Sequence, residues 1–318
     1  MMDTAHFVLV FAYLEEGHLA QIRAVDPGVE VVAVTDRQKG IELADRAEIM
    51  VGWSVPREAI QRAGRLRWIH STAAGVDQLL YREVLEQDIQ VTTSSGIHQP
   101  LVEHVFAMLL TFTRRLHIAV RNQQEHKWDR ARVAGGAVRG MTIGVLGLGS
   151  IGAEVAEKAA VFGMRVIGTK RTPSPVQHVD RVYPPEALAD VLAQSDVVVI
   201  ALPLTAETRG LLGAAEFRMM KPEAIVINIG RGPIIQEAAL IRALQERWIG
   251  GACLDVFERE PLPADSPLWA MENVILTPHV SGAWPGYLDA AVPLFCENLA
   301  RYLRGAPLLN LVERSRGY

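Results

Sequence analysis

The sequence predicts an α/β protein built from two doubly wound domains, each with a parallel sheet. Three observations lead to this prediction. The chain has 318 residues, which is more than one hydrophobic core usually organises. Short apolar runs alternate with helix-like stretches through both halves, as in parallel sheets that are covered on both faces. A long helical pattern near residue 100 separates the two series.

Composition and charge narrow the class of protein. Hydrophobic residues make up 49% of the chain, charged residues 21%, and the net charge is -4, which disfavours general binding to nucleic acid or anionic membranes. Cys253 and Cys296 lie among apolar residues without metal-ligand spacing, so we expect no metal site and a reduced, cytoplasmic protein. The apolar run 7–14 is too short to span a membrane and lacks the basic flank of a signal peptide.

Strands and helices are predicted from these apolar runs. In the first half the predicted strands are residues 7–12, 29–35, 48–53, 67–72 and 90–94, and in the second half 141–149, 164–169, 196–203, 224–230, 251–257 and 273–279. Helical spacing predicts one continuous helix over 99–124, with Pro100 in its first turn. A last helix is predicted over 286–305, where Pro293 indicates either a kink or a later start. We expect residues 1–98 and 286–318 to form one domain and residues 99–285 the other.

A glycine-rich turn follows the first strand of the second series. Gly147, Gly149 and Gly152 form the pattern G-x-G-x-x-G between an apolar strand and an amphipathic helix, which predicts a dinucleotide site. Gly147 turns the chain, Gly149 lets the backbone approach a pyrophosphate, and Gly152 packs the helix on the strand. The helix N-terminus adds partial positive charge.

Two cations end the next predicted strand, where many dinucleotide sites have a carboxylate. Lys170 and Arg171, followed by Thr172, stand 18 to 20 residues after Gly152. A carboxylate there would repel a 2′-phosphate, whereas this group attracts one, so we expect NADP(H) to be preferred and NAD(H) to be possible. The alternative is a solvated basic strand end.

Charged side chains also follow three later strands. Arg231 follows one strand, Asp255, Glu258 and Glu260 another, and His279 the last. Strand ends are where a doubly wound sheet presents its ligands, so these residues are candidates for catalysis.

The whole chain resembles the D-isomer-specific 2-hydroxyacid dehydrogenases. Four motifs carry the resemblance in order, "GLGSIG", "NIGRGP", "DVFEREPL" and "TPHVSG", together with "STAAGVDQL" and "GIHQPLVEHVFAMLL". The resemblance implies a Rossmann coenzyme domain inserted in a flavodoxin-like substrate domain. It also implies a homodimer, in which the segment from the long helix through Trp128 and "GGAVRG" packs across a two-fold axis.

The resemblance implies a role for each candidate. Arg231 clamps the carboxylate and 2-oxo group of the substrate, His279 is the acid/base, and Glu260 is its partner. These residue types suit the reaction, since a proton must reach the oxygen as a hydride reaches C2. Backbone N–H groups of Ala74, Gly75 and Val76 meet the other side of the carboxylate. The remaining cofactor contacts are Ser150, Ile151, Leu202, Pro203, Thr208, Ile229, Gly230 and Asp255, the last by accepting from the nicotinamide amide.

The predicted function is reduction of a small 2-oxo acid, such as glyoxylate or hydroxypyruvate, to a D-2-hydroxy acid. Glu260 argues against assigning the chain as a formate dehydrogenase, because formate dehydrogenases of this fold pair their histidine with Gln instead of Glu. Two alternatives stay open: an NAD-linked D-3-phosphoglycerate or D-lactate type dehydrogenase, and a dinucleotide-sensing corepressor-like module. Turnover assays with a panel of 2-oxo acids separate them.

Overall fold

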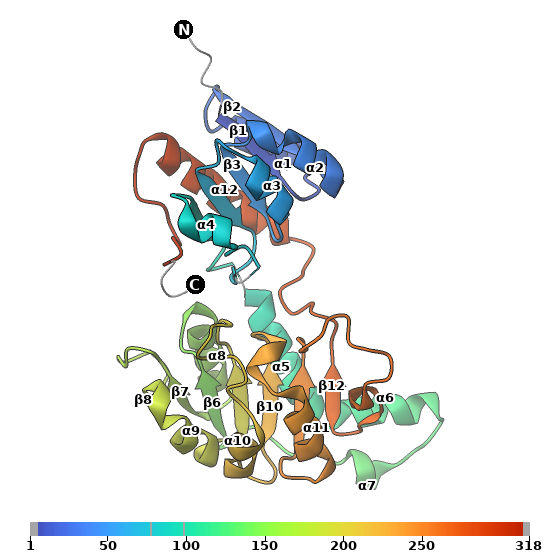
Figure 1. Ribbon diagram of the computed structural model, residues 1–318. Helices are drawn as coiled ribbons and strands as arrows, with labels where there is room; N and C mark the ends of the chain where they lie inside the picture. The colour runs from blue at the N-terminus through green and yellow to red at the C-terminus, as the bar shows by residue number, and fades with distance from the viewer. Residues whose placement is uncertain (1–5, 77, 98, 314–318) are drawn as a thin grey trace. The chain divides into compact units, whose positions relative to one another are not determined.

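The computed structural model describes residues 6–76, 78–97 and 99–313. The chain divides into two compact units, unit 1 with residues 1–97 and 284–318, and unit 2 with residues 98–283. Each unit is built on one parallel sheet, and Figure 1 labels elements of both where there is room. The predicted α/β class with two parallel sheets is therefore confirmed.

The sheet of unit 1 has five parallel strands in the order β2-β1-β3-β4-β5. Its strands are β1 His6–Val10, β2 Val29–Ala33, β3 Ile49–Gly52, β4 Trp68–Ser71 and β5 Gln90–Thr93. All five were predicted from the apolar runs, and the order is that of flavodoxin-like sheets.

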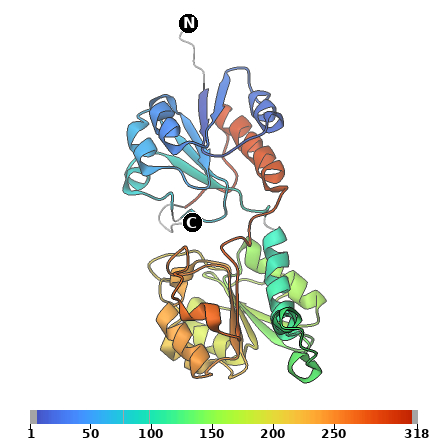
Figure 2. The same ribbon diagram turned by 90° about the vertical axis from the view of Figure 1, so that its right-hand side faces the viewer.

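Helices cover both faces of this sheet. They are α1 Glu16–Arg23, α2 Arg37–Leu43, α3 Arg57–Arg62, α4 Arg82–Glu86 and α12 Tyr287–Leu303. Alternate strand residues face opposite ways, so Val8 and Trp68 pack with α1 and α12, while Leu9 and Ile69 pack with α2, α3 and α4. Figure 2 shows α12, in red, on one side of the sheet and the helices in lighter blue on the other.

Unit 2 contains seven parallel strands in the order β12-β11-β10-β9-β6-β7-β8. They are β6 Thr142–Leu146, β7 Arg165–Thr169, β8 Arg181–Tyr183, β9 Val197–Ile200, β10 Ile225–Asn228, β11 Gly251–Leu254 and β12 Val274–Leu276. The strand order reverses between β6 and β9, which is the point where such sheets bind ligands. The sequence did not predict β8, whose three residues are too few for a period-2 pattern.

Two layers of helices enclose the sheet of unit 2. Its helices are α5 Gln99–Thr113, α6 Leu116–Gln124, α7 Arg130–Val133, α8 Ser150–Val161, α9 Leu188–Gln194, α10 Ala214–Met219 and α11 Glu237–Gln245. Helices α5 and α8 pack on one face, and α9, α10 and α11 on the other.

The prediction of one helix over residues 99–124 is wrong. The helix ends at Thr113, and Arg115 adopts a left-handed backbone with φ 53° before α6 begins. The carbonyl of Thr113 accepts from the backbone N–H of Gly136 at 2.9 Å instead of from the next helical turn. A distant segment therefore terminates the helix, which local periodicity does not reveal.

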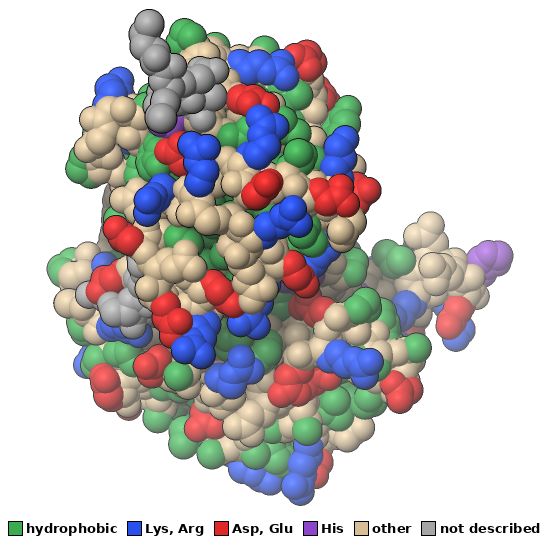
Figure 3. All heavy atoms as spheres, turned by 45° about the horizontal axis from the view of Figure 1, so that its top comes forward, with side chains coloured by type: hydrophobic (Ala, Val, Ile, Leu, Met, Phe, Trp, Pro, Cys, Tyr) green, Lys and Arg blue, Asp and Glu red, His purple; other side chains and the backbone are tan. Residues whose placement is uncertain are grey.

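Helix α12 begins at Tyr287, so Pro293 lies inside the helix and does not start it. Within the described ranges, no helix is long and apolar enough to cross a membrane. On the face drawn in Figure 3, Lys and Arg side chains are interspersed with Asp and Glu.

Candidate active site

The candidate site of unit 2 lies where its central strands end. Because the strands are parallel, the loops after β6, β9, β10, β11 and β12 share one edge of the sheet. Two glycines let these loops touch. A side chain at Gly147 would come within 2.7 Å of the carbonyl of Ala201, and one at Gly232 would overlap the backbone of Phe257.

The glycine-rich turn after β6 fits a pyrophosphate. Gly147 has φ +99°, a conformation that side chains rarely adopt, and its N–H donates to Thr169 Oγ1 at 3.2 Å. The first hydrogen bond of α8 runs from Ala153 N to Gly149 O, so the N–H groups of Ser150 and Ile151 precede it. Apart from its neighbours in the chain, no atom of the described residues lies within 4 Å of where a side chain on Gly149 would stand. The turn therefore presents N–H groups beside open space, as an anion requires.

The end of β7 presents the two predicted cations. Lys170 is half-buried and its Nζ donates to Ser174 Oγ at 3.0 Å, while Arg171 and Thr172 are exposed. A hydrogen bond from Thr205 lowers the pKa of Glu207, and the charge of Arg171 lowers it further. Arg171 therefore acts electrostatically on the loop that follows β9.

That loop contains Leu202, Pro203 and Thr208 and closes on itself. The Thr208 hydroxyl donates to the carbonyl of Pro203 at 2.7 Å and accepts from Thr205 N at 2.8 Å. Leu202 lies beside Gly147, and its carbonyl faces Gly230. The glycine-rich turn, this loop and the end of β10 are thus in contact.

Arg231 directly follows the buried residues Ile229 and Gly230. Asn228 shapes the turn, because its side chain accepts from Gly230 N at 3.1 Å and donates to Arg231 O at 3.0 Å. The guanidinium is half-buried and donates to Gly230 O at 2.9 Å. The sequence did not single out Asn228, although it stands within the "NIGRGP" motif.

His279 and Glu260 form a hydrogen-bonded pair. Nδ1 of His279 lies 2.7 Å from Oε2 of Glu260, and both side chains are about one-third exposed, at 30% and 36%. The other oxygen of Glu260 accepts from Phe257 N at 3.0 Å, which fixes the carboxylate. The structure thus brings together two of the three predicted catalytic side chains.

Asp255 is fully buried and holds the loop that carries His279. Its carboxylate accepts from Thr277 Oγ1 at 2.6 Å, Val280 N at 2.9 Å and Ser281 N at 2.9 Å. Burial opposes ionisation, but hydrogen bonds led by that of the Ser281 side chain outweigh it and keep the pKa of Asp255 below its usual value. These bonds support the left-handed backbone of His279, which has φ 52°.

The predicted substrate-binding residues Ala74, Gly75 and Val76 belong to unit 1, in the loop after β4. Among the residues that the structure describes, none accepts a hydrogen bond from their backbone N–H groups. Asp77, the next residue, lies outside the described ranges. No group of three or more His, Cys, Asp or Glu side chains that could hold a metal ion occurs among the described residues either.

A glycine-rich turn with open space beside its N–H groups, at the point where the strand order reverses, defines a dinucleotide-binding protein. Residues 106–281 match the D-isomer specific 2-hydroxyacid dehydrogenase family in its NAD binding domain. The chain belongs to this family and is an NAD(P)-dependent enzyme of the glyoxylate reductase-like kind.

Individual relatives agree with this assignment. The chain is 36% identical over 267 residues to a glyoxylate reductase from Korarchaeum cryptofilum, covering 82% of this chain and 80% of that one. It is similar to a D-isomer specific 2-hydroxyacid dehydrogenase from Xanthobacter autotrophicus Py2 in complex with NADPH and MES, with a TM-score of 0.85, 33% identity and coverage of 99% and 100%. An NADPH-dependent glyoxylate/hydroxypyruvate reductase from Sinorhizobium meliloti, in complex with NADP and sulfate, gives a TM-score of 0.85, 29% identity and coverage of 98% and 100%.

Proposed function

We propose that this protein is an NADPH-preferring reductase that converts glyoxylate, hydroxypyruvate or a similarly small 2-oxo acid into a D-2-hydroxy acid. The observation that carries the proposal is the His279–Glu260 pair, held at the sheet edge where Arg231 also lies. The glyoxylate reductase relative and the two NADP(H)-bound structures support the same substrate class and cofactor.

Each side chain has a distinct task in this reaction. Nicotinamide supplies the hydride when it is bound. His279 donates the proton to the substrate oxygen, and Glu260 orients the ring and stabilises its charged form. We assign to Arg231 the carboxylate and 2-oxo group of the substrate, and we assign substrate binding in unit 1 to the backbone N–H groups of Ala74, Gly75 and Val76.

The proposed cofactor site uses the contacts described above. The N–H groups of Ser150 and Ile151 bind the pyrophosphate, and Lys170, Arg171 and Thr172 bind the 2′-phosphate. The loops with Leu202, Pro203 and Thr208 and with Ile229 and Gly230 line the cofactor. We assign Asp255 the support of the His279 loop in addition to the nicotinamide amide contact.

Steady-state kinetics with a panel of 2-oxo acids and both cofactors tests the function. We expect the highest kcat/KM with NADPH and either glyoxylate or hydroxypyruvate. Preference for NADH with a phosphorylated 2-oxo acid would favour the phosphoglycerate type. Cofactor binding without turnover of any 2-oxo acid would favour a binding module and overturn the proposal.

The cofactor preference has its own test, the double variant Lys170→Asp/Arg171→Ala. Charge-assisted phosphate contacts contribute roughly 1.5–3 kcal/mol each, so NADPH affinity should fall by about 10²–10³-fold or more while NADH affinity changes little. The measurement is the ratio of kcat/KM for NADPH to that for NADH. The control Lys39→Asp/Arg62→Ala makes the same charge change at exposed positions of unit 1 and should leave the ratio unchanged. A wild-type ratio below one, or a ratio that the first variant does not move, would contradict the assignment.

A further inference from the structure

A chain of buried polar side chains connects β4 and β5 in unit 1. Trp68 and His70 lie on the same face of β4, and His70 pairs in register with Thr92 of β5. His70, Thr92 and Ser94 are all 0% exposed. Water therefore does not reach the imidazole, and its two nitrogens depend on protein partners.

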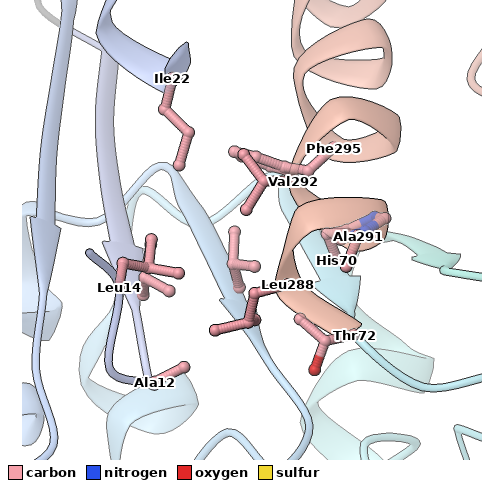
Figure 4. Close-up of a pocket in the computed structure, with 11 residues that line it drawn as sticks. Ala12, Leu14, Ile22, His70, Thr72, Leu288, Ala291, Val292 and Phe295 are labelled. Carbon is pink, nitrogen blue, oxygen red and sulfur yellow. The ribbon is translucent and has the colours of Figure 1, made fainter. Parts of the chain in front are cut away.

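Apolar groups surround the histidine ring on its helix side. The ring lies 5.3 Å from that of Phe295 in α12, measured between centroids. Figure 4 shows His70 beside Ala291 at a small cavity whose other walls include Leu14, Ile22 and Val292. Burial in these surroundings lowers the pKa of His70 to about 3, so the ring is neutral near pH 7.

The hydrogen bonds decide which ring nitrogen carries the proton. The Ser94 hydroxyl donates its single proton to the carbonyl of Ser71 at 3.1 Å. The 3.1 Å contact between His70 Nε2 and Ser94 Oγ must therefore be donated by Nε2–H. Because the ring is neutral, its Nδ1 is then an acceptor.

The opposite end of the chain agrees with this assignment. Thr92 Oγ1 accepts from the indole N–H of Trp68 at 2.8 Å, since indole only donates. The hydroxyl proton of Thr92 is then free to be donated to Nδ1 of His70, which lies 2.8 Å from Oγ1. Each hydrogen bond of the chain is then donated in the same direction, from Trp68 through Thr92, His70 and Ser94 to the carbonyl of Ser71.

This chain ends on the loop that precedes Ala74, Gly75 and Val76. Ser71 Oγ accepts from Ala73 N at 3.1 Å and donates to Gly75 O at 3.4 Å. Ser94 N donates to Ala73 O at 3.1 Å. The contacts fix the backbone on both sides of Ala74, beside the three N–H groups for which the described residues offer no acceptor.

We propose that His70, as the neutral Nε2–H tautomer, is a positioning residue that holds the loop 71–76 ready to receive the carboxylate of the substrate through its backbone N–H groups. The inference rests on the proposed function for the identity of the ligand, but not for the tautomer. Preorganised N–H groups spare the ligand the cost of ordering the loop, so the network acts on substrate binding.

The tautomer is measured first, by ¹⁵N NMR of the protein with labelled histidine. The chain has nine histidines, and the His70→Asn variant identifies the signal that belongs to His70. We expect a protonated Nε2 and an unprotonated Nδ1 that persist from pH 8 to pH 5. A proton on Nδ1, or a ring that becomes charged within this range, would overturn the proposal.

Kinetics then test the positioning role. Ser94→Ala removes the acceptor for Nε2–H, and we expect the KM for the 2-oxo acid to rise by roughly 5–30-fold, the range that corresponds to one or two kcal/mol. We expect kcat and the KM for NADPH to change less than about threefold. The variant loses an interaction that binds the substrate and the transition state equally, and such a loss raises the KM for the substrate alone. Ser94→Thr, which keeps the hydroxyl, should restore the KM.

The matched control is Ser95→Ala, which removes a hydroxyl one residue along whose partner is Thr93. It should leave the KM for the 2-oxo acid unchanged. An unchanged KM in folded Ser94→Ala, or an equal rise in the control, would overturn the positioning role. If the wild type reduces no 2-oxo acid, the proposed function fails and with it the positioning role, whereas the NMR result still decides the tautomer.

Discussion

The carboxylate of Glu260 decides which nitrogen of His279 can exchange a proton with a ligand. Because Oε2 lies 2.7 Å from Nδ1, the Glu260 side chain occupies that ring nitrogen, and Nε2 is the nitrogen left for the proposed substrate. The buried Asp255 determines where that ring stands, since its carboxylate holds Thr277, Val280 and Ser281 around His279.

His279→Gln should therefore abolish most turnover without loss of cofactor binding. A missing general acid lowers kcat by roughly 10²–10⁴-fold. The measurement is kcat for the preferred 2-oxo acid together with the Kd for NADPH by fluorescence titration. Glu258→Gln, a charge loss at an exposed residue near Glu260, is the control and should keep near-normal kcat. Near-normal kcat in His279→Gln would contradict the acid/base role.

Residue identities at this edge could be predicted from sequence, but their geometry could not. The motif "TPHVSG" identifies His279 as a candidate. The left-handed backbone of His279, however, follows from hydrogen bonds to Asp255, more than 20 residues earlier in the chain. Asn228 and Thr169 were not predicted either, because polar side chains that hydrogen-bond to turns have no periodic pattern. The predicted role of each site residue stays a prediction until variants are measured.

Elements with a strong local pattern were predicted well. Continuous apolar runs identified every strand except β8, whose pairing with β7 depends on tertiary contacts. The end of α5 was missed for a similar reason, since the donor to Thr113 O is Gly136, in a separate segment. The hydrophobic periodicity of a segment cannot predict a helix boundary that depends on a residue elsewhere in the chain.

The burial of His70 under α12 makes the stability of unit 1 depend on pH. Its folded pKa is about 3, against 6.5 in the unfolded chain, so between these values the unfolded state binds more protons. Stability therefore falls as the pH drops below 6.5. From pH 7 to pH 5 this one group should cost about 2 kcal/mol of unfolding free energy.

Urea unfolding of the wild type and of His70→Asn at both pH values checks this expectation. Between pH 7 and pH 5 the unfolding free energy of the variant should fall by about 2 kcal/mol less than that of the wild type, whatever the absolute stability of the variant. His178→Asn replaces an exposed histidine with a left-handed backbone, a conformation that Asn tolerates, and should match the wild type. Equal pH dependence in wild type and His70→Asn would mean that His70 takes up its proton over the same pH range in the folded and unfolded states.

At the scale of the whole molecule, the apolar runs predicted two doubly wound sheets, whereas their strand orders were implied only by the family resemblance. The reversal between β6 and β9 gives unit 2 a ligand-binding edge, and the glycine-rich turn lies at that reversal. Apolar runs show which segments are strands, whereas the neighbours of each strand depend on how all the crossover helices pack.

Helices α6 and α7 extend to one side of the sheet of unit 2, as Figure 1 shows. Large apolar side chains of α6 and of the segment that joins it to α7 are exposed to solvent. Leu116 is 50% exposed, Val120 54% and Trp128, between the two helices, 91%. Large apolar groups gathered on one segment are typical of a protein interface, and two copies related by a two-fold axis would bury them together. We therefore propose that this segment forms the homodimer contact.

Light scattering at micromolar concentration should give a wild-type mass near twice the chain mass of 34.9 kDa. Val120→Glu/Trp128→Glu should shift the mass toward 34.9 kDa, because burying two carboxylates without partners costs more than the apolar contact contributes. Trp269→Glu places one such charge at another exposed tryptophan of unit 2, 55% exposed, and should remain dimeric. A monomeric wild type would refute the dimer. A double variant that stays dimeric while Trp269→Glu dissociates would instead move the interface to the surface around Trp269.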